Sequence, residues 1–151
     1  MRHAIVAAIA ILSVAGVTAE PSPGQQGQGG WTTLFDGTSL NGWNRVGDAN
    51  WEIVDGTVQA TKGGTSFLVT SASYDDFQIT LDFWTSDDAN SGVFIRCQDP
   101  KDITAQGTKL IVVMNGIKTV DVDHKGHVRG PLALQYGAGT VRFRNVRIRA
   151  L

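Results

Sequence analysis

Apolar and polar residues alternate through most of the chain after Trp31, and Gly, Asn or Asp interrupts the alternation at short intervals. A period of two puts successive side chains on opposite faces of a β-strand. No window keeps the spacing of three and four residues that an amphipathic helix requires. The pattern therefore predicts a nearly all-β domain, in which two sheets pack as a sandwich to bury one face of each strand.

Two hairpins are predicted from their turns, because Asp-Gly and Asn-Gly favour the type I′ turn that joins antiparallel strands. The paired segments are Trp51–Val54 with Thr57–Ala60 around Asp55-Gly56, and Leu110–Met114 with Ile117–Val122 around Asn115-Gly116. Each arm has the length of a short strand. Turn chemistry alone thus places two antiparallel pairs in the domain.

Two further segments show which way their strands face. In Phe77–Trp84 the odd positions are apolar, whereas most of the even positions are polar. In the last strand the apolar set changes phase at Asn145, so we expect a β-bulge there that keeps apolar side chains inward. Outward charges on a strand commonly prevent sheets from associating, and we assign this role, rather than binding of an anionic polysaccharide, to Arg142, Arg144, Arg147 and Arg149.

The N-terminus has the composition of an export signal. A basic start is followed by the apolar run Ala4–Val17, and small residues up to Ala19 precede a cleavage position ahead of Glu20. A membrane anchor is the alternative, but the run is shorter than the roughly 20 residues that span a bilayer. We therefore expect residues 1–19 to be removed, and the mature chain, without a membrane span, to be periplasmic or extracellular.

Residues 20–30 are rich in Gly, Gln and Pro, so they are predicted to form a flexible linker before a domain at 31–151. A chain of 151 residues with 42% apolar content fits one globular domain. The net charge of −1 provides no basic field, and this disfavours nucleic-acid binding. Cys97 is the single cysteine, so the chain has no disulfide of its own, and we expect an inert strand residue.

Three phrases carry a resemblance to a known family. They are LFDGTSLNGW at Leu34–Trp43, NSGVFIR at Asn90–Arg96 and GPLALQYGAGTVRFRNVRI at Gly130–Ile148. In this order they resemble the secreted bacterial 3-keto-disaccharide hydrolase family, also described as 3-keto-glucoside 1,2-lyase or 3-keto-2-hydroxy-glucal hydratase domains. The resemblance implies a concanavalin A-like, laminarinase-like jelly roll and a hydrolase or lyase that cleaves glycosidic bonds of 3-keto-glucosides or disaccharides.

In the chemistry that this resemblance implies, a 3-keto group acidifies the proton at C2 of the sugar. A base removes that proton, the glycosidic oxygen leaves from C1, and water then adds. The resemblance implies a carbohydrate partner and, for stabilising the enolate, a divalent metal cofactor or basic residues. The sequence itself leaves a metal site unassigned.

The chain departs from the family at two places. After Gln106 the family continues through roughly two or three strands that are absent here, so we expect some central strands of the jelly roll to be missing before Gly107. Leu134-Gln135 is followed by Tyr136-Gly137, where many relatives have the acid/base candidate Asp-His. Two alternatives to an enzyme therefore stay open: a non-catalytic carbohydrate-binding module and a degenerate family member.

Arg96 is the first candidate catalytic residue, because alternation puts Phe94 and Arg96 on one outward face. Its guanidinium could orient a keto oxygen and offset the negative charge of an enediolate-like intermediate. Asp82 or Glu52 is the candidate base. The alternative role for Arg96 is a structural ion pair with Asp82 or Asp99.

The candidate substrate-binding residues are Trp84, Phe94, Asn90 and Gln135. Trp84 shares the polar side of its strand with Asp82, where a ring can cover the C–H face of a sugar while a carboxylate accepts hydrogen bonds from hydroxyls. A loop that covers Trp84 is the equal alternative. Asn90 and Phe94 belong to the NSGVFIR phrase, and Gln135 belongs to the closing phrase.

Overall fold

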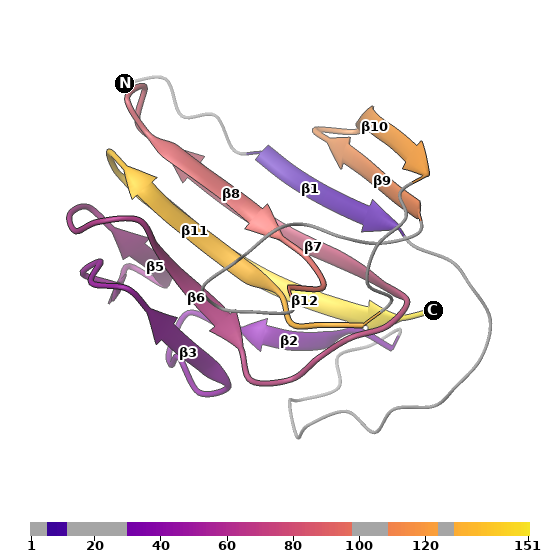
Figure 1. Cartoon of the computed structure of the whole chain (residues 1–151), viewed down its shortest axis with the longest axis horizontal. Helices are drawn as coiled ribbons and strands as arrows, with labels where there is room; N and C mark the ends of the chain where they lie inside the picture. The colour runs from indigo at the N-terminus through magenta and orange to yellow at the C-terminus, as the bar shows by residue number, and fades with distance from the viewer. Residues whose placement is uncertain (1–5, 12–29, 98–108, 124–128) are drawn as a thin grey trace.

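The computed structural model describes residues 6–11, 30–97, 109–123 and 129–151. These residues form β-strands and no helix, which confirms the predicted all-β class (Figure 1). The strands are β1 (Val6–Ile11), β2 (Thr32–Phe35), β3 (Trp43–Val46), β4 (Glu52–Val54), β5 (Thr57–Ala60), β6 (Ser66–Thr70), β7 (Phe77–Thr85), β8 (Asn90–Phe94), β9 (Lys109–Met114), β10 (Ile117–Asp123), β11 (Ala133–Ala138) and β12 (Val141–Ala150). A membrane-spanning helix is accordingly not found in this part of the chain.

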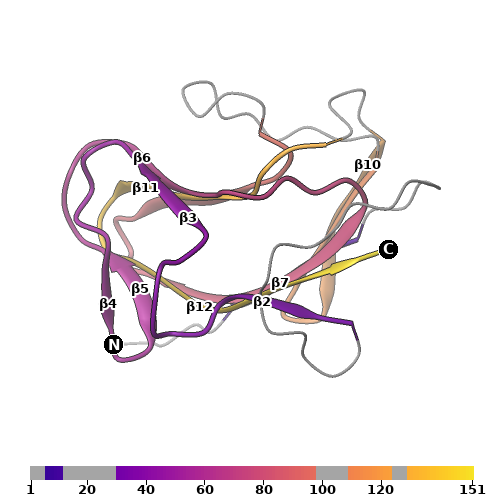
Figure 2. The same cartoon turned by 90° about the horizontal axis from the view of Figure 1, so that it is seen from below.

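The strands are arranged in two sheets that pack face to face as a jelly-roll sandwich, as predicted. The larger, eight-stranded sheet has the order β10-β9-β1-β7-β12-β5-β4, and β2 pairs with another part of β12. The four-stranded sheet has the order β3-β6-β11-β8. Figure 2 shows the two layers from the side, with the β9–β10 hairpin at one end of the larger sheet.

The core lies between the sheets and receives apolar alternate positions of strands such as β5, β7 and β12. Phe77, Ile79 and Leu81 of β7 are buried, whereas Gln78 and Thr80 are only half-buried on the opposite face, so the predicted two-faced strand is confirmed. The four-stranded sheet supplies buried side chains to the same core, among them Leu68, Leu134 and Tyr136. One apolar layer therefore holds both sheets together.

A buried aromatic cluster also connects the two sheets. The Trp51 ring meets Tyr136 of β11 at a centroid distance of 6.4 Å and Phe143 of β12 at 6.5 Å. Edge-to-face and tilted ring contacts of this kind add to the free energy that burial contributes. Trp51 is thus a core residue, as its apolar surroundings in the sequence indicate.

Both predicted hairpins are present, with the backbone that their turn residues favour. Asp55 and Gly56 have φ values of 49° and 71°, and Asn115 and Gly116 have 51° and 79°. Positive φ at both central residues is the requirement of a type I′ turn. The turns therefore set the register of β4 with β5 and of β9 with β10.

The predicted bulge in the last strand is also confirmed. Asn145 has φ 52°, and the register of β12 with β7 shifts between Arg144 and Arg147. The extra residue restores the inward phase. The apolar residues on both sides of it are buried: Val141, Phe143, Val146 and Ile148.

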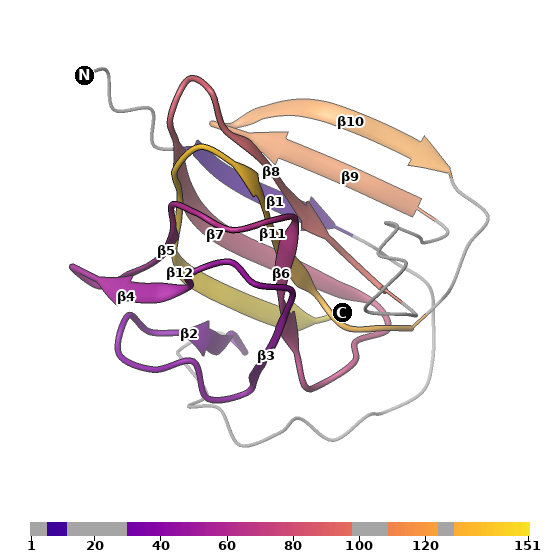
Figure 3. The ribbon, with the colours of Figure 1, turned by 60° about the vertical axis from the view of Figure 1, so that its left-hand side comes forward.

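The apolar N-terminal segment has a place in the sheet that the sequence did not indicate. Val6–Ile11 forms β1, which lies between β7 and β9 and is antiparallel to both (Figure 3). The remainder of the predicted leader, most of the linker and the junction of Gln106 with Gly107 lie outside the described residues.

Replacement of Leu134 by Ala should lower the free energy of unfolding by about 3 kcal/mol, because it removes a fully buried side chain from between the sheets. Ile117→Ala is the matched control, since Ile117 is 69% exposed and should change stability by less than about 0.5 kcal/mol. Urea unfolding followed by tryptophan fluorescence measures both. Equal losses in the two variants would contradict the position of the core.

Candidate functional site

Three of the predicted substrate-binding residues lie together on the outer face of the four-stranded sheet. In the antiparallel ladders, Gln135 of β11 stands opposite Gly92 of β8 on one side and Phe67 of β6 on the other. Residues directly opposite each other project from the same face, and so do residues two positions apart along a strand. Asn90 and Phe94 therefore share this face with Gln135 and Phe67. We call this surface the binding face.

The binding face is built around two phenyl rings. Phe67 and Phe94 are half-buried and meet edge to face, with centroids 5.8 Å apart and planes at 85°. They pack on a small apolar cluster that is separate from the main core and contains Val69, Cys97 and Ala133. Val69, Cys97 and Ala133 are buried, so they form a packed base for the two rings, and Phe67 and Phe94 are the half-buried members that remain partly accessible.

Glycines in the two family phrases make room for the polar groups of this face. A Cβ on Gly92 would lie 3.0 Å from Phe94 Cε2 and 3.2 Å from Gln135 Oε1, so the absence of a side chain lets the ring and the amide lie over the strand. A Cβ on Gly137 would lie 2.8 Å from Asn90 Nδ2. The rings offer apolar surface for sugar C–H groups, and the amides offer donors and acceptors for hydroxyls.

Phe67 was missed by the sequence analysis, although the chain carries a signal for it. In Ser66–Thr70 the apolar residues Phe67, Leu68 and Val69 are consecutive, so both faces of β6 are apolar. A strand of an antiparallel sandwich normally has one polar face. A strand that is apolar on both faces indicates that its outer face is also covered or used.

The other candidates lie on the opposite outer face of the sandwich, on the eight-stranded sheet. Trp84 of β7 stands opposite Arg142 of β12, whose guanidinium lies over the Trp84 ring at 5.3 Å from its centroid. Arg142 Nε donates a hydrogen bond to Gln59 Oε1 at 2.6 Å, and Gln59 Nε2 donates to Glu52 Oε1 at 3.3 Å. Trp84 and Glu52 thus belong to one row of contacts across the sheet.

Asp82 is on this same face and is also engaged by its neighbours. Its Oδ2 accepts hydrogen bonds from Arg144 Nε at 3.2 Å and from Asn145 Nδ2 at 2.8 Å. Packed sheets are separated by about 10 Å, so neither Asp82 nor Glu52 can reach a sugar on the binding face. The candidate bases are therefore separated from Asn90, Phe94 and Gln135. Trp84 is the one predicted substrate-binding residue that shares a face with Asp82.

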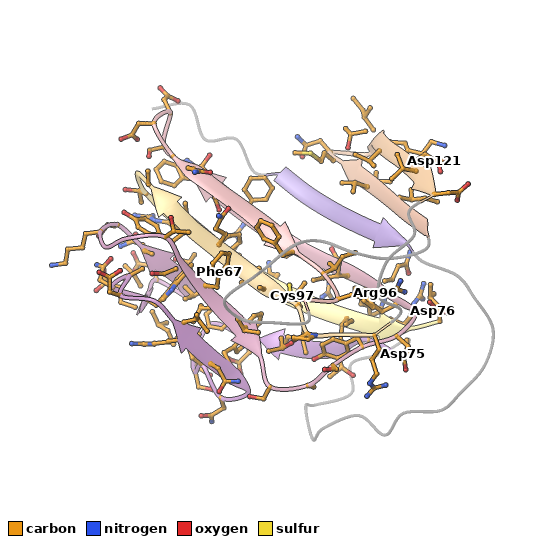
Figure 4. All side chains as sticks on the ribbon, viewed as in Figure 1. Phe67, Asp75, Asp76, Arg96, Cys97 and Asp121 are labelled. Carbon is orange, nitrogen blue, oxygen red and sulfur yellow. The ribbon has the colours of Figure 1, made fainter. Side chains whose placement is uncertain are left out.

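The prediction that Arg96 faces outward beside Phe94 is wrong. β8 ends at Phe94, and Arg96 has φ 55°, in the left-handed region, so the alternation of faces stops before it. The side chain is 1% exposed. Arg96 Nε and Nη2 donate hydrogen bonds to the Asp75 carbonyl oxygen at 2.9 and 2.6 Å, and Nη2 also donates to Asp76 Oδ1 at 2.8 Å (Figure 4).

Arg96 therefore joins the end of β8 to the segment that precedes β7. This is the kind of structural ion pair that we set as the alternative, but among the described residues its partner is Asp76 and not Asp82, and Asp99 lies outside the described residues. Burial lowers the pKa of Arg96, and the nearby carboxylates of Asp76 and Asp75 oppose that shift. The Nη1 atom of Arg96 is buried and has no hydrogen-bond partner among the described residues. A guanidinium so enclosed holds two segments together and is closed to a substrate on the surface.

Gly130 completes this junction. A Cβ at Gly130 would lie 2.5 Å from the carbonyl carbon of Arg96 and 2.7 Å from the Cys97 carbonyl oxygen, so only glycine allows the backbones to approach. Arg129 Nη1 donates to Asp75 Oδ2 at 2.6 Å on the same side of the molecule. The close approach explains why the closing family phrase begins with glycine.

Cys97 is buried, and burial raises the pKa of its thiol to about 11. The thiolate is the nucleophilic form of cysteine, so this residue is unreactive at neutral pH. The predicted inert role agrees with this burial, but the predicted place in a strand is wrong, because β8 ends at Phe94 and the left-handed backbone at Arg96 precedes Cys97.

The described residues do not supply the divalent metal site that the family resemblance implies. In the described part of the chain, no three side chains of His, Cys, Asp or Glu come close enough together to hold a metal ion. Asp75 and Asp76 are adjacent, but each of them is paired with an arginine. We therefore derive no catalytic step through a metal.

Sequence comparison identifies the protein family of this chain. The profile of the 3-keto-alpha-glucoside-1,2-lyase-like domain matches residues 30–102 and 100–149, which together include most of the chain. The chain belongs to this family and is thus a member of a carbohydrate-active class of jelly-roll domains. The two matched pieces meet close to the break that we expected between Gln106 and Gly107.

A curated relative with a related name is similar to part of the chain. It is a 3-keto-disaccharide hydrolase of Bacteroides thetaiotaomicron, 28% identical over 82 residues that represent 46% of this chain. The match covers 28% of that relative, so this chain spans less than a third of its length.

Solved structures show the same fold. Two of them are candidate glycosyl hydrolases of Parabacteroides distasonis, with TM-scores of 0.69 and 0.63 and identities of 19% and 21%. They cover 81% and 80% of this chain, which in turn covers 94% and 99% of them. The third is the carbohydrate-binding module CBM66 of Bacillus subtilis, with a TM-score of 0.57, 17% identity, and coverage of 85% of this chain and 100% of the module.

Loss of the buried ion pair should cost far more stability than loss of an exposed pair. Arg96→Met removes the ion pair with Asp76 and the hydrogen bonds to the Asp75 carbonyl oxygen, and should lower the free energy of unfolding by about 3 kcal/mol. Arg144→Met removes an arginine that is 47% exposed and pairs with Asp82, and should cost less than about 1 kcal/mol. Urea unfolding at pH 7 compares them. Similar losses would show that Arg96 is not enclosed.

The high pKa of Cys97 makes the fold sensitive to alkaline pH. The unfolded thiol loses its proton near its ordinary value of 9.0, whereas the folded thiol keeps it up to about 11. Stability from this group is therefore complete below pH 9 and is lost as pH rises from 9 to 11, by roughly 2 to 3 kcal/mol.

Urea unfolding between pH 8 and pH 11 measures this loss, with Cys97→Ala as the control. The Ala variant should be less sensitive to pH by that amount. Burial also raises the pKa of Tyr74, but Tyr74 is present in both proteins and its effect cancels in the comparison. Parallel pH profiles of the two proteins would contradict the prediction.

Proposed function

We propose that this domain binds a glycoside, in particular a 3-keto-glucoside or a related disaccharide, on the binding face of its four-stranded sheet. One observation carries the proposal: Asn90, Phe94 and Gln135, together with Phe67, lie on one face, whereas the candidate bases Asp82 and Glu52 lie on the opposite face. Aromatic rings and amide groups on one face are the groups that binding of a sugar requires. Family membership supports the choice of sugar.

In this proposal the two phenyl rings cover an apolar face of the sugar, and the amides select its hydroxyl pattern. The Gln135 amide and the Phe94 ring both border Gly92, so a sugar ring over Gly92 can touch both groups. Asn90 extends the polar part of the face along β8. The similarity in fold to the module CBM66 supports a domain that binds sugar without cleaving it.

The second candidate function is cleavage of 3-keto-glucosides, either by hydrolysis or by a lyase reaction followed by hydration. It is favoured by the family match and by the name of the Bacteroides relative. The reaction needs a base within hydrogen-bond reach of the C2 proton. Asp82, Glu52 and Arg96 do not reach the binding face, so in this candidate the base is a group other than these three.

We also propose that the domain acts after export. The composition of residues 1–19 supports a leader that is cleaved ahead of Glu20, which would place the domain in the periplasm or outside the cell. Glycosides of external origin would then meet the binding face directly. The N-terminal residue of the protein recovered from its native host tests this step.

Substitution of the binding face should weaken sugar binding without unfolding the protein. Phe94→Ala removes one ring and Gln135→Ala removes an amide, and each should raise the Kd for a 3-keto-glucoside about tenfold. Trp84→Ala is the matched control, since it removes a larger ring from the opposite face and should leave the Kd unchanged. Isothermal titration calorimetry measures the Kd, after circular dichroism confirms the β fold.

The same proteins distinguish the two candidate functions. A chromogenic 3-keto-glucoside is incubated with each protein, with and without added divalent metal. Binding without release of the chromophore supports a binding module, whereas release that is lost in Phe94→Ala but kept in Trp84→Ala supports cleavage on the same face. Loss of binding in Trp84→Ala alone would place the site on the eight-stranded sheet and contradict the proposal.

A further inference from the structure

The position of β1 in the eight-stranded sheet is the feature that neither the family nor the proposed sugar site explains. β1 pairs with β7 over six residues and with β9 over four, so it has a ladder partner on each side. Ile9, for example, stands opposite Thr80 on one side and Val113 on the other. A segment with the composition of a leader thus occupies a central place in the sheet.

The neighbours of β1 cannot simply close over its position. β7 and β9 are each antiparallel to β1, so they run parallel to each other. If β1 were removed, both would expose a row of unpaired N–H and C=O groups. Direct pairing of β7 with β9 would replace two antiparallel ladders with one parallel ladder, which has a different hydrogen-bond pattern. An antiparallel strand is what fits between them.

The family match places this position at the join of its two pieces. β7 belongs to the piece that ends at residue 102, and β9 belongs to the piece that begins at residue 100. The strand between them comes from neither piece, because β1 precedes both in the chain. The N-terminal segment therefore completes the sheet at the point where the matched sequence is interrupted.

We infer that the position between β7 and β9 is a strand-acceptor site for an extended apolar segment, and that Val6–Ile11 of the same chain is its occupant. The segment then has a structural function in any chain that retains it. A chain that begins at Glu20, as the export proposal has it, leaves the acceptor site open. The inference itself does not depend on sugar binding.

A pair of engineered cysteines tests the occupant and its register. The full chain, made by cell-free synthesis so that the N-terminus is kept, carries Cys97→Ala together with Ile9→Cys and Thr80→Cys. These two positions are directly opposite in the ladder, so an intramolecular disulfide should form on oxidation. The matched control is Ala8→Cys with Thr80→Cys, in which the two positions face opposite sides of the sheet, and it should cross-link about tenfold more slowly.

Peptide mass spectrometry and non-reducing gels measure the cross-link. An intramolecular disulfide in the Ile9 pair, and little in the Ala8 pair, supports the inference. Disulfide-linked dimers would show that a second copy fills the site, and equal cross-linking of both pairs would show that the register is absent. Either result overturns the inference.

Hydrogen exchange provides a second measurement that needs no cysteine. Ala8→Pro in the full chain removes a ladder donor from β1 and should speed the exchange of backbone amides in β7 and β9 about tenfold or more. Gln25→Pro, in the predicted linker, is the control and should leave that exchange unchanged. Unchanged exchange in Ala8→Pro would also overturn the inference. Both readouts are independent of sugar binding, so failure here leaves the proposed function untouched.

Discussion

The ladder between β7 and β12 is the constraint on which the sandwich depends. β12 pairs with β7 along nearly its whole length and with β5 and β2 on its other side, so it fixes the centre of the larger sheet. The bulge at Asn145 is what makes this possible. Without the extra residue, the phase of the strand would turn Val146 and Ile148 outward and put arginines into the core, where an unpaired charge is costly.

Strands, turns and the bulge could be predicted because their causes are local. Turn dipeptides set the hairpins, and the phase slip at Asn145 is visible in the order of residues. The site could not be predicted in the same way, because alternation shows that Trp84 and Phe94 both face outward but not that they lie on different sheets. That separation depends on pairing between distant segments. The position of the Arg96 side chain depends on the left-handed backbone of Arg96 itself and on the close approach of Gly130. A periodic pattern predicts neither of these.

The predicted binding residues and the predicted catalytic base therefore have to meet different geometric requirements. Binding groups need only share a face, and the ladders of β6, β11 and β8 provide that for Phe67, Gln135 and Phe94. A base must reach one proton within hydrogen-bond distance, which is a far stricter requirement. Asp82 and Glu52 fail it because the hydrophobic core lies between them and the binding face. The described residues thus bring the proposed recognition groups together on one face and leave the predicted bases on the other.

The position of β8 at the edge of its sheet affects how well ordered the binding face is. Among the described strands, β8 has a ladder neighbour only on the side of β11, so Asn90 and Phe94 project from an edge strand. Edge strands are held by fewer hydrogen bonds and open more easily than central ones. The Arg96 junction offsets this at one end, because it ties the residue just beyond β8 to Asp75 and Asp76. Order of the binding face thus depends on a buried ion pair that lies away from the proposed sugar site.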